Sequence, residues 1–250
     1  LKQTFHLKEV FVSPNLVDDE EISLRDTCRA LSGNLDNYIE DNTVVAVSWG
    51  KTLNCLAGQI QPLKAKDIKV VQLNGGVAKS ASSTGASQIV DALTMAGHGI
   101  GYMFPVPAIV DSKHTSEILQ EETQVKNVLR LAKEAEVSIF SIGALSKDSI
   151  LYEVEYLKDE DFQALEKNKA VGDIASRYFD INGNIALKEL DDRVVGFGLE
   201  ELREKEWTIA IAVGVNKVDA IIGALRAGFM NVLYTDEKTA REILNRNLLG

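Results

Sequence analysis

Lys51 and Thr52 stand directly after Gly50, where a buried strand predicted over residues 43–47 turns into a helix. A helix start leaves backbone N–H groups without partners and carries the positive end of the helix dipole. Together with the Lys51 ammonium and the Thr52 hydroxyl, these groups could bind an anion such as a phosphate ester. The turn is not a Walker loop, because that motif requires a glycine where Val45 stands. The alternative is that Gly50 only turns the chain.

A second lysine follows another predicted strand, in the turn that contains Gly214, Asn216 and Lys217. A lysine at a helix start opposes the helix dipole, so its presence at both Lys51 and Lys217 is explained if an anion lies between them. The alternative is that both are solvated lysines on exposed turns.

Two further glycine turns end predicted strands, at Asn74-Gly75-Gly76 and at Gly143. Glycine allows the backbone to approach a ligand closely, or simply to turn. In an open parallel sheet, ligands bind outside the carboxyl ends of the strands, near the point where the strand order reverses. We therefore expect all four turns to meet at one edge of the sheet.

Asp173 follows Gly172 in an otherwise apolar stretch. One interpretation is an ion pair with Arg177, one helical turn further on. The other is that its carboxylate accepts hydrogen bonds from sugar hydroxyl groups. The spacing alone leaves both interpretations open.

The sequence contains no arrangement typical of a catalytic or metal site. There is no G-x-S-x-G motif, and His6, His98 and His114 lack acidic partners at useful spacing. No two of these histidines stand four residues apart on a helix, and no G-x-G-x-x-G motif follows the first predicted strand. We therefore predict no catalytic residue, no metal site and no cofactor.

The composition predicts an ordinary globular protein of the cytoplasm. The 250 residues can form one large α/β domain or two small ones, and the net charge of −10 argues against a nucleic-acid surface on this chain. No apolar run approaches the roughly 20 residues of a membrane span, and no secretory signal is present. Cys28 and Cys55 are interpreted as reduced core residues. Because the first residue is Leu1 rather than Met, we expect the chain to be a piece of a longer protein.

Apolar strands alternate with amphipathic helices, which predicts a parallel sheet covered on both faces. In the helix predicted at 83–96, Ile89, Leu93 and Met95 are expected to be buried. Residues 144–206 lose this rhythm and are predicted to form an insertion or lid at the ligand edge. Strands are predicted at 43–47, 68–73, 101–107, 137–142, 208–213 and 232–235, and helices at 19–39, 83–96, 116–135, from Asn216 to a cap at Gly228, and 237–247.

Several segments together resemble the effector-binding domain of the SorC-type sugar-binding transcriptional regulators, which include deoxyribonucleoside and central glycolytic gene regulators. The segments follow the family's order and spacing over essentially the whole chain. They are Leu7–Val10, Val47–Leu53, Val70–Gly76, Val171–Ile174 with Phe179–Asp180, and Lys217–Arg226 with Gly228.

This resemblance implies a Rossmann-like, three-layer α/β fold shared with ribose-phosphate isomerase, glucosamine-phosphate deaminase and the CoA-transferases, with a small inserted subdomain. It also implies a phosphorylated sugar as the effector, with a phosphate loop after the first strand, an acidic residue facing sugar hydroxyls and a basic residue at the pocket. Asn74 stands where relatives can carry lysine or arginine, so we expect no covalent imine there. The implied effector-binding residues are Gly50, Lys51, Thr52, Asn74, Gly75, Gly76, Asp173, Asn216 and Lys217.

The resemblance further implies that residues 1–250 are one effector-binding domain, that the family's helix-turn-helix domain is absent from this chain, and that operator DNA is bound only through that absent domain. A homodimer or homotetramer is expected, with Phe229 and Met230 as candidate exposed interface residues. The alternative function is a phosphosugar isomerase or deaminase on the same fold, for which only Asp173 offers an acid or base.

Overall fold

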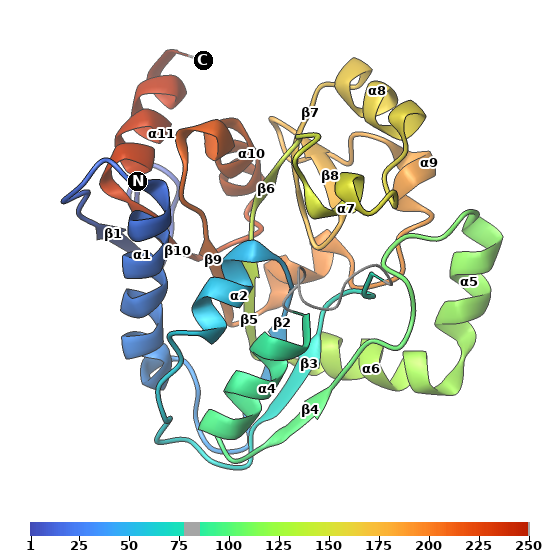
Figure 1. Cartoon of the computed structure of the whole chain (residues 1–250), viewed down its shortest axis with the longest axis horizontal. Coiled ribbons are helices and arrows are strands. Elements are labelled where there is room, and N and C mark those ends of the chain that lie inside the picture. The colour runs from blue at the N-terminus through green and yellow to red at the C-terminus, as the bar shows by residue number, and fades with distance from the viewer. Residues whose placement is uncertain (78–85, 250) are drawn as a thin grey trace.

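A computed structural model describes residues 1–77 and 86–249. Seven strands form one parallel sheet in the order β1-β10-β9-β5-β2-β3-β4 (Figure 1). The strands are β1 (Glu9–Ser13), β2 (Val44–Val47), β3 (Lys69–Gln72), β4 (Ile100–Tyr102), β5 (Val137–Ser141), β9 (Trp207–Ile211) and β10 (Val232–Asp236).

The central strands are apolar on both faces because helices cover both sides of the sheet. In β2, Val45 and Val47 point into one hydrophobic cluster and Ala46 into the other, and all three are fully buried. Val45 lies opposite Val137 of β5 on one side and Val70 of β3 on the other. Such nearly continuous apolar runs are typical of parallel strands buried between two helical layers.

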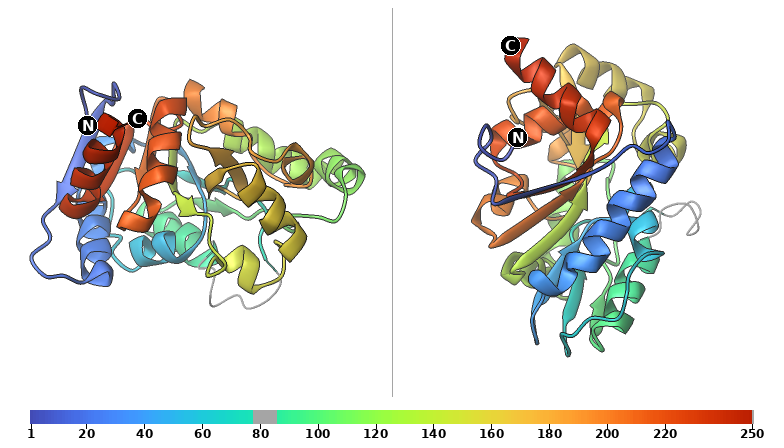
Figure 2. Two further views of the ribbon diagram at one scale, coloured as in Figure 1. Left: turned by 90° about the horizontal axis from the view of Figure 1, so that it is seen from above. Right: turned by 90° about the vertical axis from the view of Figure 1, so that its left-hand side faces the viewer.

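Each helical layer contributes its apolar stripe to one of these clusters, so the fold has three layers, as the right-hand view of Figure 2 shows. Helices α1 (Glu20–Asn34), α2 (Lys51–Ala57) and α4 (Ala86–Ala96) cover one face, and α6 (Thr123–Glu134), α10 (Val218–Ala227) and α11 (Glu237–Leu249) cover the other. Helix α5 (Lys113–Glu121) precedes α6. This arrangement confirms the Rossmann-like fold class expected from the sequence.

The strand order reverses between β2 and β5. From β2 the chain builds outward through β3 and β4, and after returning to β5 it builds in the other direction through β9 and β10. The loops that leave the carboxyl ends of β2 and β5 therefore diverge. In open α/β sheets this divergence creates the crevice where ligands bind.

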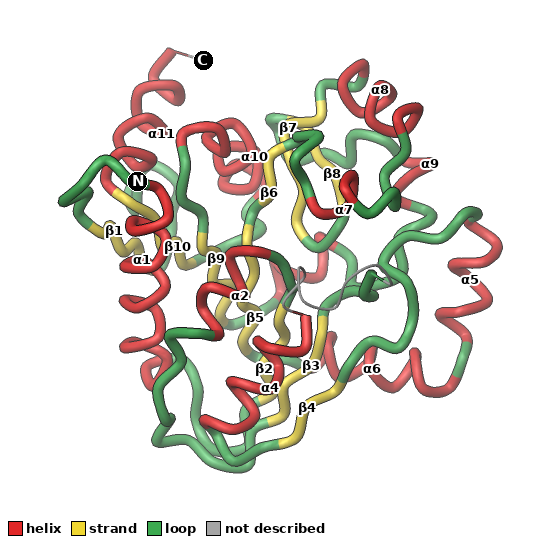
Figure 3. The backbone as a smooth tube through the Cα atoms, viewed as in Figure 1, coloured by secondary structure: helices red, strands yellow, loops and turns green. Residues whose placement is uncertain are grey.

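The chain between β5 and β9 forms a smaller subdomain, whose helices α7 to α9 and strands β7 and β8 lie at the upper right of Figure 3. An antiparallel sheet orders β6 (Gly143–Ala144), β7 (Ala170–Ile174) and β8 (Arg177–Asp180), and Leu157, Phe162 and Leu165 contribute to a core of its own. The remaining elements of the segment are α7 (Ile150–Glu153), α8 (Asp159–Lys167), α9 (Lys188–Asp191) and the 3₁₀ helix η2 (Leu199–Glu204). The sequence placed an insertion or lid at 144–206, and its action as a lid stays a prediction.

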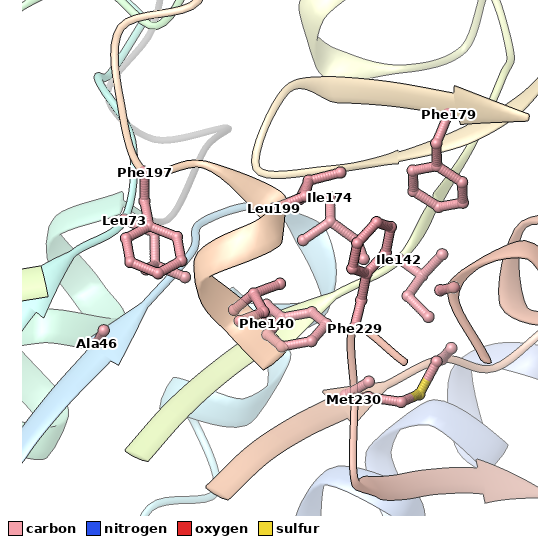
Figure 4. Packing of buried hydrophobic residues seen from close by; sticks show 14 of the residues in the cluster. Ala46, Leu73, Phe140, Ile142, Ile174, Phe179, Phe197, Leu199, Phe229 and Met230 are labelled. Atoms are coloured by element: carbon pink, nitrogen blue, oxygen red, sulfur yellow. The ribbon is translucent and has the colours of Figure 1, made fainter. Parts of the chain in front are cut away.

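Phe229 and Met230 lie in the core, so the prediction that they are exposed interface residues is wrong. Gly228 adopts a left-handed conformation (φ 69°) at the end of α10 and turns the chain back, with the Phe229 N–H donating to the Ala224 carbonyl at 3.1 Å. Only 0% and 3% of Phe229 and Met230 remain exposed. Figure 4 shows Phe229 pointing toward Phe179, and the two ring centroids are 5.8 Å apart in edge-to-face contact.

Three helix predictions need correction. The helix expected at 19–39 ends at Asn34 and continues as a 3₁₀ turn over Leu35–Asn37. The helix expected at 116–135 is two helices, because Glu122 takes an extended conformation (ψ 136°) between α5 and α6. Met95 is 78% exposed, since it lies two positions after the buried Leu93 and so faces away from the sheet. The predicted start of that helix at 83 lies outside the described residues.

Within residues 1–77 and 86–249, no helix combines the length and the apolar character needed to cross a lipid bilayer.

Candidate functional site

The turn after β2 opens α2 at Lys51. Gly50 has φ 132° and ψ 178°, a conformation that favours glycine, and its carbonyl accepts the Asn54 N–H at 2.9 Å in the first turn of the helix. Thr52 is buried, whereas the Lys51 side chain is 66% exposed and places its Nζ 4.0 Å from Oε1 of Glu153 in α7. The Lys51 ammonium therefore faces the small subdomain across the carboxyl edge of the sheet.

The turn after β3 is hydrogen-bonded to two neighbouring turns. Asn74 is buried, and its Nδ2 donates to the Ser176 hydroxyl at 3.0 Å. The Gly75 carbonyl accepts the Trp49 indole N–H at 2.8 Å, from the turn after β2. The Gly76 N–H donates to the Val106 carbonyl, and the Gly76 carbonyl accepts the Ala108 N–H. These two hydrogen bonds fix the turn to the loop that follows β4.

Asp173 lies at the edge of the small sheet, where its Oδ2 accepts the Ser176 N–H at 3.1 Å. Burial raises the pKa of the Asp173 carboxyl to about 6, although the Ser176 N–H and the charge of Lys217 act in the opposite direction.

Arg177 does not pair with Asp173, so the ion-pair interpretation of Asp173 is wrong. Residues 170–180 form the β7–β8 hairpin instead of a helix, and Asp173 lies opposite Tyr178. The Arg177 guanidinium binds the Asp191 carboxylate at 2.6 Å and also donates to the Phe197 and Gly196 carbonyls. Arg177 thus links β8 to the end of α9 and to the chain at residues 196–197. It does not neutralise the Asp173 carboxylate, which remains available to the site.

Lys217 ends the 3₁₀ helix η3 (Val215–Lys217), at the start of α10, and is half-buried. Burial lowers the pKa of its ammonium, while the carboxylates of Glu20 and Asp173 act to raise it and the charge of Lys51 acts to lower it further. Within the part of the chain that the structure describes, this ammonium makes no hydrogen bond and no ion pair. Asn216 beside it is exposed.

The structure thus brings the side chains of Lys51, Asn74, Asp173 and Lys217 to one edge of the sheet, at the reversal of strand order. Two ammonium groups can neutralise a phosphate, while a carboxylate and an amide can bind hydroxyl groups. Gly75 and Gly143 contribute the close approach of their backbones, whereas a side chain on Gly76 would enter open space. Of the other two predicted side chains, Asn216 is exposed at the start of α10 and Thr52 is buried in the first turn of α2.

Sequence reasoning missed several residues of this neighbourhood. Ser176 links Asp173 to Asn74, and Trp49 links the turns after β2 and β3. Among the described residues, the buried Ser48 hydroxyl and the buried Asn74 Oδ1 have no hydrogen-bond partner. Buried polar atoms are normally paired, so both are candidates for contact with a bound ligand. In the sequence, neither Ser48 nor Ser176 belongs to a motif that would identify it as a binding residue.

Two surface hollows lie outside this group of residues, and most of the charged side chains that line them are carboxylates. One, of about 250 Å³, borders the site through Glu20 and Gly214 and continues toward Asp18 and Asp236. The other, of about 370 Å³, lies between α6 and η2 around Glu134 and Glu201. Their acidic walls disfavour an anion, so the lysine-bearing edge remains the candidate site.

The Rossmann-like sheet, with its charged edge at the strand-order reversal and a small subdomain above it, defines a small-molecule-binding α/β domain. A family model described as "Putative sugar-binding domain" matches residues 1–245, and the chain belongs to this family, the sugar-binding domain of SorC-type transcriptional regulators.

Individual relatives agree with this assignment. The chain is 31% identical over 245 residues to the deoxyribonucleoside regulator of Bacillus subtilis, covering 98% of this chain and 78% of the relative. It is 26% identical over 252 residues to the sorbitol operon regulator of Klebsiella pneumoniae, with 98% and 78% covered. The crystal structure of a transcriptional regulator from Streptococcus pneumoniae superposes with a TM-score of 0.91 at 26% identity, covering 98% and 94%.

Substituting Gly75 by alanine should destabilise the domain, whereas the same change at Gly76 should not. A Cβ on Gly75 would lie 2.4 Å from the Pro107 carbonyl oxygen and 2.5 Å from that of Val106, both backbone atoms. We expect the free energy of unfolding to fall by about 1–3 kcal/mol for Gly75→Ala and to change by about 0.5 kcal/mol or less for Gly76→Ala. Urea denaturation of both variants measures this, and equal losses would contradict the close approach at Gly75.

The raised pKa of Asp173 should appear in the pH dependence of stability. Because the folded pKa of about 6 exceeds the ordinary aspartate value of 3.8, the unfolded chain releases this proton first as the pH rises. The free energy of unfolding of the wild type, relative to Asp173→Asn, should therefore fall by about 2–3 kcal/mol between pH 4 and pH 6–7 and then level off. Chemical denaturation of both proteins from pH 4 to 8 measures the difference, and parallel profiles would refute the raised pKa.

Proposed function

We propose that the domain binds a phosphorylated sugar as the effector of a transcriptional regulator. The phosphate lies between Lys51 and Lys217, against the backbone of the turn at Gly50 and the Thr52 hydroxyl. The sugar hydroxyls meet Asp173 and Asn74, and Asn216 lies at the rim. The relatives named as regulators support the regulatory part of this proposal, and the charges at the site support the phosphate.

The single observation that carries the proposal is the ammonium of Lys217. It is half-buried with its pKa lowered by desolvation, and it makes no hydrogen bond or ion pair within the described residues. A buried charge without a partner is costly, so a protein that keeps one gains when an anion binds there. The charge of Lys51 acts on Lys217 in the same neighbourhood, and two adjacent cations favour a ligand with more than one negative charge.

The sugar end of the ligand fits the polar groups of the opposite wall. The Asp173 carboxylate can accept hydrogen bonds from hydroxyl groups, and the unpaired Asn74 Oδ1 can accept another. Asn74 offers an amide where a lysine would offer an amine. The ligand is therefore held without a covalent bond at this position.

Effector binding would connect the two parts of the fold. Lys51 belongs to the main sheet, Asp173 to the small subdomain, and Lys51 already faces Glu153 of α7. A ligand that contacts both parts stabilises the arrangement in which they are close, and differential affinity for two arrangements is sufficient for regulation. We propose that the coupled output is operator binding by a helix-turn-helix domain of the full regulator, acting as a homodimer or homotetramer in the cytoplasm.

A second candidate, a phosphosugar isomerase or deaminase, is favoured by one observation. A carboxyl with a pKa of about 6 could exchange a proton with a substrate near neutral pH. Incubating the purified domain with paired aldose and ketose phosphates separates the two functions. We expect binding without interconversion, and turnover at an ordinary enzymatic rate of about 1 per second or faster would replace the regulator by an enzyme.

Lys51→Ala should weaken the binding of a sugar phosphate about tenfold or more, because the variant loses one charged hydrogen bond to the phosphate. Binding of the same sugar without its phosphate should be unchanged. Lys64→Ala is the matched control, since Lys64 is also an exposed lysine and pairs with Asp36, away from the site. Isothermal titration of the three proteins against a panel of sugar phosphates measures this. An unchanged affinity for Lys51→Ala would exclude Lys51 from the site.

A further inference from the structure

The two cysteines of the chain lie close together, on the neighbouring helices α1 and α2. Cys28 of α1 is fully buried, and its thiol lies 3.8 Å from the carbonyl oxygen of Thr52 in α2. Cys55 follows Thr52 by three residues in the same helix, packs against the hydrophobic cluster that contains Cys28, and is partly exposed to solvent. Figure 1 shows α1 and α2 side by side. A disulfide requires two cysteines within bridging distance and access of the oxidant to one of them, and the partly exposed Cys55 provides that access.

The surroundings of Cys55 make it the reactive member of the pair. The neighbouring Cys28 thiol lowers the pKa of the Cys55 thiol to about 7, and the Arg25 guanidinium acts in the same direction, while burial and Glu21 act against it. The proximity of Cys55, together with burial, raises the pKa of Cys28. The thiolate is the nucleophile in thiol oxidation, so Cys55 reacts with the oxidant first. The Cys28 thiol can then attack the oxidised Cys55 sulfur.

We propose that Cys28 and Cys55 form a reversible disulfide when the domain meets a hydroperoxide, and that this bond weakens effector binding at the turn that opens α2. The second half of this inference depends on the sugar-phosphate site proposed above, and the first half does not.

The chemistry balances with a hydroperoxide as the oxidant. The Cys55 thiolate attacks one peroxide oxygen, the O–O bond breaks, and the leaving oxygen takes the thiol proton, which gives a sulfenic acid on Cys55 and one molecule of water for hydrogen peroxide. The Cys28 sulfur then attacks the Cys55 sulfur. The S–O bond breaks, the S–S bond forms, and the Cys28 proton leaves with the hydroxyl as a second water. Two thiols lose two electrons in total, and the peroxide gains them.

The disulfide would act on the effector site through α2. Cys55 lies one helical turn after Lys51 and three residues after Thr52, on a helix of seven residues. A disulfide sets the two sulfurs about 2.05 Å apart and the two Cβ atoms about 3.5–4.5 Å apart, so its formation constrains how α2 packs against α1. Binding sites tolerate displacements of only about 0.5 Å. Cys28 also lies close enough for the charge of Lys217 to affect it, so both lysines of the site are adjacent to the cysteine pair.

The first experiment tests the bond itself. The reduced domain is treated with hydrogen peroxide, excess reagent is removed, and intact mass and free thiols are measured without reductant. We expect a loss of two mass units and of both thiols per chain, with full recovery after dithiothreitol. Cys55→Ala and Cys28→Ala should each fail to lose two mass units. Mass gains of 16 or 32 units on the wild type, or covalent dimers, would overturn the inference.

The second experiment tests the coupling. Affinity for a sugar phosphate that binds the reduced domain is measured on the reduced and the oxidised wild type, and on peroxide-treated Cys55→Ala. We expect a loss of affinity of about fivefold or more in the oxidised wild type alone. Equal affinities of a verified disulfide form and the reduced form would overturn the coupling. If no sugar phosphate binds the reduced domain, the proposed function fails, and the mass measurement still decides the disulfide.

Discussion

The close approach of Gly143 and Gly172 allows the small sheet to pack against α10, and the geometry of the site depends on it. Gly143 pairs with Asp173 across β6 and β7, and a Cβ on Gly143 would lie 2.2 Å from the Asp173 Oδ1. A Cβ on Gly172 would lie 2.1 Å from the Gly143 carbonyl oxygen and 2.5 Å from the Ala220 Cβ of α10. The contact at Gly172 is with backbone, so only glycine at this position allows β6, β7 and α10 to pack at this distance, whereas a side chain on Gly143 would displace the Asp173 carboxylate. The pairing places the Asp173 carboxylate at the carboxyl edge of the main sheet.

This placement explains the electrostatics of the site. Asp173 and Lys217 are each desolvated, and each partly offsets the other: the lysine lowers the pKa of the carboxyl, and the carboxylate raises that of the ammonium. Lys51, on the opposite side, repels Lys217. Within the described residues, Lys217 makes no ion pair, and Lys51 has only the exposed Glu153 carboxylate at 4.0 Å. This arrangement of charges is the physical reason for proposing that an anion binds at this edge.

The sequence predicted the fold well because apolar periodicity and glycine turns are local signals. The strands, the helices and their parallel alternation follow from them, whereas the Rossmann-like fold followed from the family resemblance and the expected reversal of strand order from the general rule for open parallel sheets. The errors come from features without such a signal. Glu122 breaks a helix with no glycine or proline, and the β7–β8 turn uses Ala175 and Ser176 at positive φ. Ser176 and Trp49 contact the site neighbourhood only because the fold brings distant turns together. Phe229 and Met230 were misplaced because the direction of the chain after Gly228 depends on its backbone conformation.

The position of β1 has a consequence for how the molecule is assembled. β1 lies at the edge of the sheet and its ladder joins Glu9 to Val232 and Ser13 to Asp236, near the other end of the sequence. During synthesis this strand therefore has no partner until residues 232–236 have emerged from the ribosome. Such non-local closure slows folding and leaves strand edges transiently open to other chains. The docking of β1 therefore cannot precede the formation of β10, so the two ends of the described chain close the sheet together.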